Sequence, residues 1–179
     1  MTLNDIDNFP KEAQILIDTN IIIYAALAHD VFGDPSRRLL KRIEMGEIYG
    51  FIPTIVMNEV LHRFMIAELI ENGIGRNPRD IINKVKKEPG ILHSLSKTWI
   101  DIAYLYQINC SIISEKEHTF TRSLNIAKEY NLLAKDAYIA AFAYTYNISH
   151  IASNDKDFSR VPWLSVWKPL PDYKGDSPS

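Results

Sequence analysis

The chain has 179 residues, of which 46% are apolar and 23% charged, and its net charge is −2. This composition predicts one globular domain and excludes global attraction to nucleic acid, so an RNA or DNA partner would need a local basic patch. The single cysteine, Cys110, excludes an internal disulfide. Apolar runs are far shorter than the roughly 20 residues of a membrane span, and the N-terminus carries no secretion signal, so we expect a cytoplasmic protein without membrane association.

Short apolar runs alternate with segments of helical periodicity along the chain. Runs of strand length lie at residues 15–17, 48–53, 108–113, 150–153 and 163–167. Helical patterns lie at residues 21–28, 34–44, 54–70, 77–88, 92–106, 114–130 and 134–147. Thr54 is expected to cap the third helix, and Ser114 with Glu117 has the spacing of a capping box for the sixth.

This alternation predicts an α/β protein with a three-layer α/β/α fold. Because the strands are continuously apolar, the central sheet is expected to be mainly parallel and covered by helices on both faces. The last strand, at 163–167, is expected at an edge of the sheet. Ligands of such sheets gather at the carboxyl ends of strands, which is where Asp18 and Asp155 both fall.

Asp18 stands in an otherwise apolar run, QILIDTNIIIY, at residues 14–24. A buried ionised carboxylate is costly unless something pairs with it, so Asp18 is expected to be a helix cap, half of an ion pair or a ligand. Asp155 follows the strand at 150–153, and an ordinary turn role is its alternative. Both residues therefore have a structural reading and a functional one.

Two further carboxylates lie on predicted helices. Glu59 borders an apolar stripe, and its alternative role is an i,i+4 ion pair with Arg63. Asp136 shares a small-residue face with Ala140 and Ala143, so it is expected to be buried close to the sheet. Each carboxylate consequently needs a partner.

Four carboxylates in one place would repel each other and raise their own pKa values. Such a set is stable only when cations occupy it, and oxygen ligands select hard ions such as Mg²⁺ or Mn²⁺. One or two of these ions can activate water and stabilise the charge that develops on a phosphodiester. The acidic residues therefore indicate a hydrolytic metal site.

Four segments resemble, in order and spacing, the acidic motifs of the PIN domain family, and most closely those of VapC-type toxin endoribonucleases. The segments are IDTNIIIY at 17–24, NEV at 58–60, AKDAYIAAFAY at 134–144 and IASNDKDF at 151–158. The resemblance implies that the catalytic and metal-binding residues are Asp18, Glu59, Asp136 and Asp155, with Mg²⁺ or Mn²⁺ as cofactor. It places Asn20 and Ser153 beside them as polar supporting residues.

The resemblance also implies single-strand-specific RNA cleavage, a homodimer and inhibition by a small antitoxin. It divides the chain into an N-terminal extension at 1–13, a PIN-like nuclease domain at 14–169 and a flexible tail at 170–179. The segment at 73–106 is longer than the family pattern requires.

Three residues near the acidic motifs have candidate roles. His62 and Arg63 lie one turn beyond Glu59 and are candidate RNA contacts. Asp157 competes with Asp155 to be the fourth ligand; we expect Asp155 to be the ligand and Asp157 to support the turn, with Phe158 as an apolar anchor beside it.

The sequence is also compatible with other functions. One is a PIN-domain nuclease that processes RNA without an antitoxin, and another is a catalytically inactive PIN-like binding module. Loss of a carboxylate would favour the inactive module, and all four are present. A phosphotransferase of the haloacid-dehalogenase type would need a second aspartate two residues after Asp18, where this chain has Asn20.

Overall fold

A computed structural model describes residues 4–172 of the chain. Within them, six strands form one sheet in the order β1-β6-β5-β2-β3-β4, and every pairing is parallel. The strands are β1 (Asn4–Asp5), β2 (Gln14–Ile17), β3 (Tyr49–Pro53), β4 (Cys110–Ile113), β5 (His150–Ala152) and β6 (Ser165–Lys168). The predicted α/β class and parallel sheet are confirmed.

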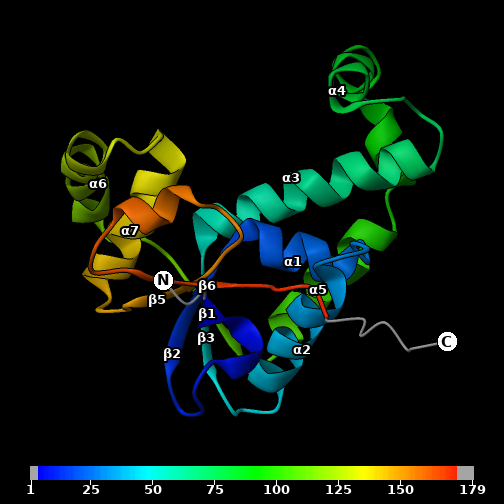
Figure 1. Ribbon diagram of the computed structural model, residues 1–179. Coiled ribbons are helices and arrows are strands. Elements are labelled where there is room, and N and C mark those ends of the chain that lie inside the picture. Colours follow the sequence, from blue (N-terminus) through cyan, green and yellow to red (C-terminus); the bar gives the residue numbers. More distant parts are fainter. Residues whose placement is uncertain (1–3, 173–179) are drawn as a thin grey trace, which may run out of the picture.

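Helices cover both faces of this sheet, as predicted for three layers. They are α1 (Thr19–Ala26), α2 (Gly33–Glu44), α3 (Thr54–Glu71), α4 (Pro78–Lys87), α5 (Lys97–Gln107), α6 (Glu117–Tyr130) and α7 (Ala134–Thr145). Figure 1 shows α6 and α7 on one side of the sheet and α1, α2 and α5 on the other. Across residues 4–172, no helix combines the length and the apolar character needed to cross a membrane.

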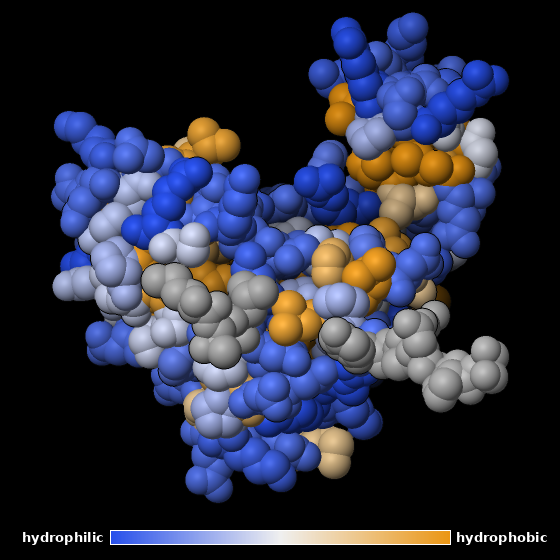
Figure 2. Space-filling view, viewed as in Figure 1, coloured by the Kyte–Doolittle hydropathy of each residue, from blue (hydrophilic) through white to orange (hydrophobic). Residues whose placement is uncertain are grey.

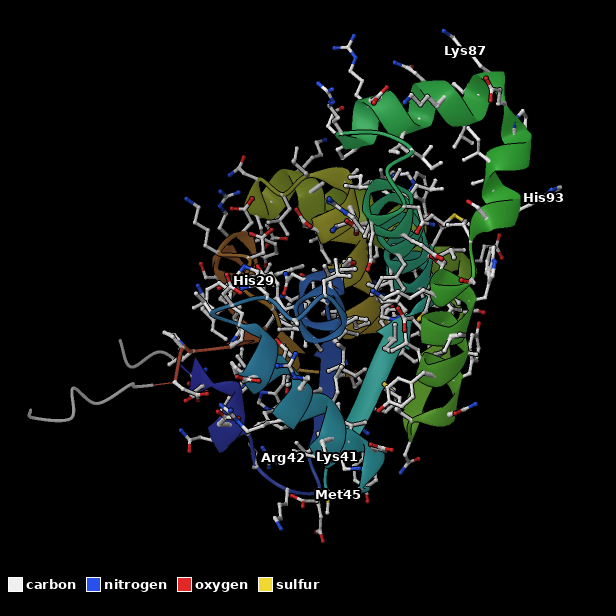
Figure 3. All side chains as sticks on the ribbon, turned by 90° about the vertical axis from the view of Figure 1, so that its right-hand side faces the viewer. His29, Lys41, Arg42, Met45, Lys87 and His93 are labelled. Carbon is white, nitrogen blue, oxygen red and sulfur yellow. The ribbon has the colours of Figure 1, made fainter. Side chains whose placement is uncertain are left out.

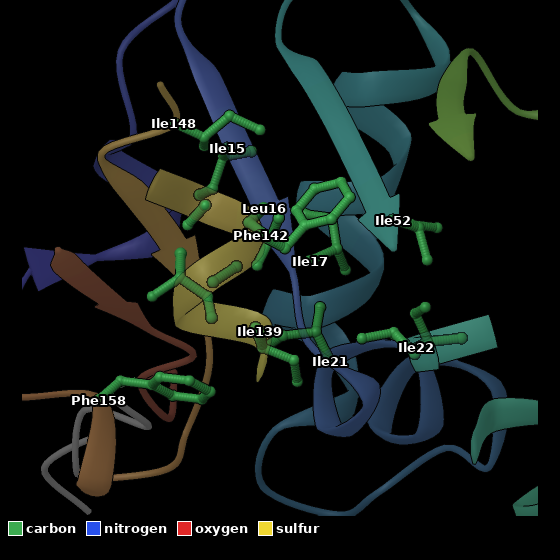
Figure 4. Close-up of a cluster of buried hydrophobic side chains, with 14 of the residues drawn as sticks. Ile15, Leu16, Ile17, Ile21, Ile22, Ile52, Ile139, Phe142, Ile148 and Phe158 are labelled. Carbon is green, nitrogen blue, oxygen red and sulfur yellow. The ribbon is translucent and has the colours of Figure 1, made fainter. Parts of the chain in front are cut away.

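The core is built around β2, an inner strand of the sheet. Ile15, Leu16 and Ile17 are each fully buried, because helices lie on both faces of this inner strand. Figure 4 shows this cluster with Phe142 of α7 and Ile21 of α1 among its neighbours. The apolar run that precedes Asp18 therefore anchors the carboxyl end of β2 in the middle of the molecule.

The prediction that the last strand lies at an edge is wrong. On its outer side β6 pairs with β1, through Asn4 opposite Trp167 and Asp5 opposite Lys168. Ile6 and Phe9 follow β1 and are buried in the same core. A two-residue strand leaves no periodic pattern, which is why the sequence did not reveal it.

The two ends of the chain were predicted to be an extension and a tail. Residues 1–3 of the predicted extension and 173–179 of the predicted tail lie outside the described residues. Just before the latter, Asp172 accepts two hydrogen bonds from Arg38, which also pairs with Asp7.

The capping box predicted at Ser114 and Glu117 is also wrong. Helix α6 begins at Glu117, and its N-cap residue, Lys116, makes no side-chain cap. The intervening Glu115 instead accepts a hydrogen bond from the backbone N–H of Ile55, at 2.9 Å, and one from the Thr54 hydroxyl. The cap expected from Thr54 is wrong as well: Thr54 is the first residue of α3, and its hydroxyl donates to this carboxylate, about 60 residues away.

The helix predicted at 92–106 is divided into a 3-10 segment, Pro89–Ser94, and α5, which starts at Lys97. The buried carboxylate of Glu68, on α3, accepts hydrogen bonds from the backbone N–H groups of Ser96, Lys97 and Thr98 at 2.7, 3.0 and 2.8 Å. These donors would otherwise be unsatisfied at the start of the helix. Burial raises the pKa of Glu68, but the hydrogen bonds outweigh it and lower the pKa to about 2.

We predict that Glu68→Gln lowers the free energy of unfolding by about 2–4 kcal/mol, because an amide NH₂ would face backbone donors in a buried site. In the wild type this stabilisation should be present above the ordinary pKa of 4.5 and be lost as the pH falls towards about 2. Urea unfolding at neutral pH measures the effect. Glu71→Gln is the matched control, because Glu71 makes only an exposed pair with Lys97; equal losses in the two variants would contradict the capping role.

Candidate active site

The site lies where the order of strands reverses relative to the chain. From β2 the chain continues to β3 on one side, whereas β5 pairs with β2 on the other. Ligands of parallel sheets gather at such a switch point, outside the carboxyl ends of the strands. The backbone N–H of Asp18 donates to the carbonyl of Ala152, at 3.1 Å, so the segments that follow β2 and β5 are adjacent.

Asp18 is both a helix cap and the centre of a polar network. It is 3% exposed, and its Oδ1 accepts from the backbone N–H of Thr19, at 2.7 Å, at the start of α1. Its Oδ2 accepts from Asn20 Nδ2 at 2.6 Å and from the Ser153 hydroxyl at 2.7 Å. Burial raises the pKa of Asp18, although the hydrogen bond from Ser153 and the charge of Lys135 oppose that shift.

Asn20 and Ser153 contact Asp18 directly and also fix the loop after β5. Asn20 donates to Ser153 Oγ at 3.0 Å and accepts from the backbone N–H of Asn154 at 3.1 Å. Ser153 Oγ further accepts from the backbone N–H of Asp155, at 3.0 Å. The start of α1 and the end of β5 are thereby joined into one polar unit, and the supporting roles expected for the two residues remain predictions with this geometry behind them.

Asp155 and Asp157 make different contacts in the turn that follows β5. Asp155 Oδ1 accepts from the backbone N–H of Asp157 at 2.8 Å, while the Asp157 carboxylate pairs with Arg160 at 2.9 Å. Phe158 is fully buried, which confirms its role as an anchor. The capping acceptor in this turn is therefore Asp155 rather than Asp157, and the assignment of Asp155 as a ligand remains a prediction.

Glu59, on α3, is paired with the side chain of Lys135, whose role the sequence did not reveal. Its Oε2 accepts from Lys135 Nζ at 2.7 Å and from the Thr19 hydroxyl at 3.0 Å, and its Oε1 lies 3.5 Å from Arg63. Burial raises the pKa of Glu59, but Lys135 and Thr19 outweigh it, and the net pKa is lowered. The only signal for Lys135 in the sequence was its place next to Asp136.

Asp136 lies in the first turn of α7 and is 8% exposed. Its pKa is raised to about 6, mainly by burial and further by the charges of Asp155 and Asp18, while Lys135 opposes the shift. The acids are thus close enough to repel each other, as the sequence suggested. Lys135 is the basic group that offsets this repulsion at Asp18, Glu59 and Asp136 alike.

The donors present fit a hard divalent cation in their chemistry. All are carboxylate oxygens. Burial is the main cause of the raised pKa of Asp136, and the charges of Asp155, Asp18 and Asp157 add a repulsion that a cation would relieve. Within residues 4–172, no three His, Cys, Asp or Glu side chains are gathered closely enough to hold an ion in common. The structure therefore brings the acidic side chains into one electrostatic unit without a completed coordination shell.

A groove of about 540 Å³ borders Glu59 and is lined by His62, Lys135 and Tyr138 among others. His62 and Arg63 are both exposed, so the predicted RNA contacts lie on the accessible side of α3. Figure 2 shows that this face of the molecule is hollowed between the part formed by α6 and α7 and the part formed by α4.

Comparison with known proteins adds the family. The PIN domain family matches residues 15–164. Ribonuclease VapC2 of Methanocaldococcus jannaschii is 33% identical over 156 residues, which cover 87% of this chain and 94% of that protein. Ribonuclease VapC6 of the same organism is 22% identical over 159 residues, which cover 87% of this chain and 97% of that protein.

Two solved structures share the fold at low sequence identity. One is VapBC2 from Rickettsia felis bound to a DNA fragment from its promoter, with a TM-score of 0.58, 16% identity and coverage of 87% of this chain and 98% of that chain. The other is a toxin–antitoxin complex from Klebsiella pneumoniae, with a TM-score of 0.51, 20% identity and coverage of 88% and 98%.

We predict that Lys135→Met, in the presence of chelator, lowers the free energy of unfolding by about 1–2 kcal/mol, because Glu59 and Asp18 lose their partly buried counter-charge. Lys128→Met is the control: Lys128 is an exposed lysine on α6 and should change stability by less than about 0.5 kcal/mol. Chemical unfolding measures both variants. If they behave alike, Lys135 does not balance the acids.

We predict that Asp136→Asn stabilises the metal-free protein in a pH-dependent way. In the folded state the pKa of Asp136 is about 6, against 3.8 for an ordinary aspartate. Ionisation of Asp136 therefore lowers the free energy of unfolding, and this loss grows as the pH rises between these two values. The gain from Asp136→Asn should be near zero at about pH 4 and reach roughly 1–3 kcal/mol above pH 7. Denaturant titrations at several pH values measure it, and a gain independent of pH would contradict the strained carboxyl.

Proposed function

The chain belongs to the PIN domain family, and from this premise we propose that it is a divalent-metal-dependent endoribonuclease that acts as the toxin of a toxin–antitoxin pair. The observation that carries the proposal is the group of carboxylates at the switch point of the sheet, which we call the acidic unit: Asp18, Glu59, Asp136 and Asp155. There Asp18, Glu59 and Asp136 share Lys135 as their counter-charge. An enzyme that cleaves phosphodiesters with Mg²⁺ or Mn²⁺ needs such an excess of carboxylates.

The carboxylates that would hold the cation are those of Asp18, Glu59, Asp136 and Asp155, and an ion would have to draw them closer together than they lie here. When bound, the ion supplies charge stabilisation at the phosphate and an activated water. Asn20 and Ser153 keep Asp18 oriented, because each donates to the same carboxylate oxygen, Oδ2.

Lys135 has a second task in this proposal. Its Nζ holds Glu59 Oε2 in place and lies beside the groove where RNA would enter. The Lys135 ammonium group can pair there with a phosphate oxygen of the substrate, a contact that does not depend on the base sequence. His62 and Arg63, exposed on the same helix as Glu59, would continue this contact along the backbone of a single strand.

The proposal includes two protein partners. A small antitoxin is supported by the relatives named VapC and by the toxin–antitoxin complexes that share the fold. A homodimer is supported by exposed apolar side chains in a groove of about 480 Å³ beside α6 and α7, where Phe120 and Leu124 are 60% and 51% exposed. Surfaces of this kind mark sites of protein association.

The test is cleavage of a labelled single-stranded RNA by the purified protein. We expect cleavage with Mg²⁺ or Mn²⁺ and none after exhaustive chelation. Asp155→Asn should lower the rate by at least about tenfold because it removes a ligand charge, whereas Asp157→Asn, its matched control two residues away, should act mainly on stability through Arg160. Cleavage that survives chelation, or a larger rate loss in Asp157→Asn, would refute the corresponding part of the proposal.

A further inference from the structure

A basic arm, defined here as residues 74–95, projects from the domain and has no part in the acidic unit. It contains α4 and the 3-10 segment that follows. Five basic and two acidic residues give it a net charge of +3 in a chain whose total is −2. The arm therefore concentrates positive charge against the sign of the whole molecule.

The arm is a built structure with its own small core. Ile81 of α4 and Leu95 pack with Ile66 and Leu69 of α3, and all four are buried. At its far end, the carboxylate of Glu68 fixes the first turn of α5. The arm is thus fixed to α3 at both ends, so its surface charges have defined positions.

The apolar and basic residues of α4 lie on opposite faces. Ile81 is buried, and Arg79, Lys86 and Lys87 are exposed. Lys87 points away from the body of the molecule in Figure 3. Within residues 4–172, these three cations have no ion-pair partner, whereas Lys84 lies 3.8 Å from Asp80.

The arm stands on the helix that carries part of the acidic unit. Glu59 and Leu69 are both on α3, and ten residues of helix place them about 15 Å apart along its axis. In Figure 1, α4 lies at the end of α3 remote from the sheet. A strand of RNA that leaves the acidic unit along α3, past His62 and Arg63, would reach the arm within a few nucleotides.

We propose that the arm is a second RNA-binding surface, which holds the phosphate backbone of a single strand outside the cleavage site. This inference rests on the proposed function. Nucleic-acid affinity comes chiefly from lysine and arginine at phosphates, which the exposed face of α4 supplies. A docked protein is disfavoured, since protein interfaces are depleted in lysine and have an apolar centre. No large hydrophobic side chain of residues 74–95 is among the exposed ones.

The experiment compares two variants of equal charge change. Arg79→Gln/Lys86→Gln/Lys87→Gln neutralises the arm. Lys11→Gln/Lys41→Gln/Lys128→Gln removes three exposed lysines elsewhere; Lys41 lies at the opposite end of the molecule from Lys87 in Figure 3. Thermal unfolding should show both variants folded, because none of the six side chains is buried.

Binding of a fluorescent RNA of about 20 nucleotides is measured by anisotropy at several salt concentrations in chelator, and cleavage of this RNA and of a tetranucleotide is measured with Mn²⁺. We expect the arm variant to bind the long RNA about tenfold more weakly and to lower the slope of log affinity against log salt by up to about 2, at about 0.7 per phosphate contact. Cleavage of the tetranucleotide should be unchanged.

Equal affinity and slope in the arm variant and the control variant would overturn the inference and would point to a protein partner or to no partner. Equal losses on the long RNA and the tetranucleotide would also overturn it, because the tetranucleotide is too short to bridge the acidic unit and the arm. If the wild type cleaves neither RNA, the proposed nuclease fails instead. The binding assay still tests the arm in that case.

Discussion

The buried carboxylate of Asp18 is the constraint on which the rest of this structure depends. It ends the central strand, where the apolar core leaves it 3% exposed, and so it needs donors on every side. The start of α1 supplies Thr19 and Asn20 as donors and the end of β5 supplies Ser153. Lys135 of α7 adds a nearby positive charge. The same requirement that fixes these elements also creates a concentration of negative charge at the switch point.

The basic side chains near the acidic unit have a role that follows from its negative charge. The acidic unit attracts a cation but repels a polyanion, so an RNA substrate needs positive groups nearby. Lys135 and Arg63 border the acids, and the basic arm lies farther along α3. Under the proposed function, the metal ion and the nucleic acid would each meet a different local field on a chain whose net charge is −2.

The sequence predicted those features that depend on local patterns. The apolar runs located the inner strands. The acidic residues and their motif spacing singled out Asp18, Glu59, Asp136 and Asp155, whose roles as ligands stay predictions. Features made by distant partners were missed. Glu68 and Glu115 cap helices about 30 and 60 residues away, so no local motif marks them. Lys135 was missed because its role depends on where α3 places Glu59, which is 76 residues away.

Errors at the edge of the sheet have the same physical origin. β1 is two residues long and is stabilised by pairing with β6, more than 160 residues later in the chain. The Ser114 and Glu117 pair had the right spacing for a capping box, but the adjacent Glu115 made a stronger contact with α3. Tertiary contacts overrode local preference in each case.

The central claim is that the acidic unit is a cation site balanced by Lys135 when no ion is bound. The most direct measurement is a crystal structure with saturating Mn²⁺, in which anomalous scattering locates the ion. The account predicts an ion bound by Asp18 and at least one of the other three carboxylates, with Lys135 displaced from Glu59. A well-ordered site without an anomalous peak, in which Lys135 still contacts Glu59, would contradict it.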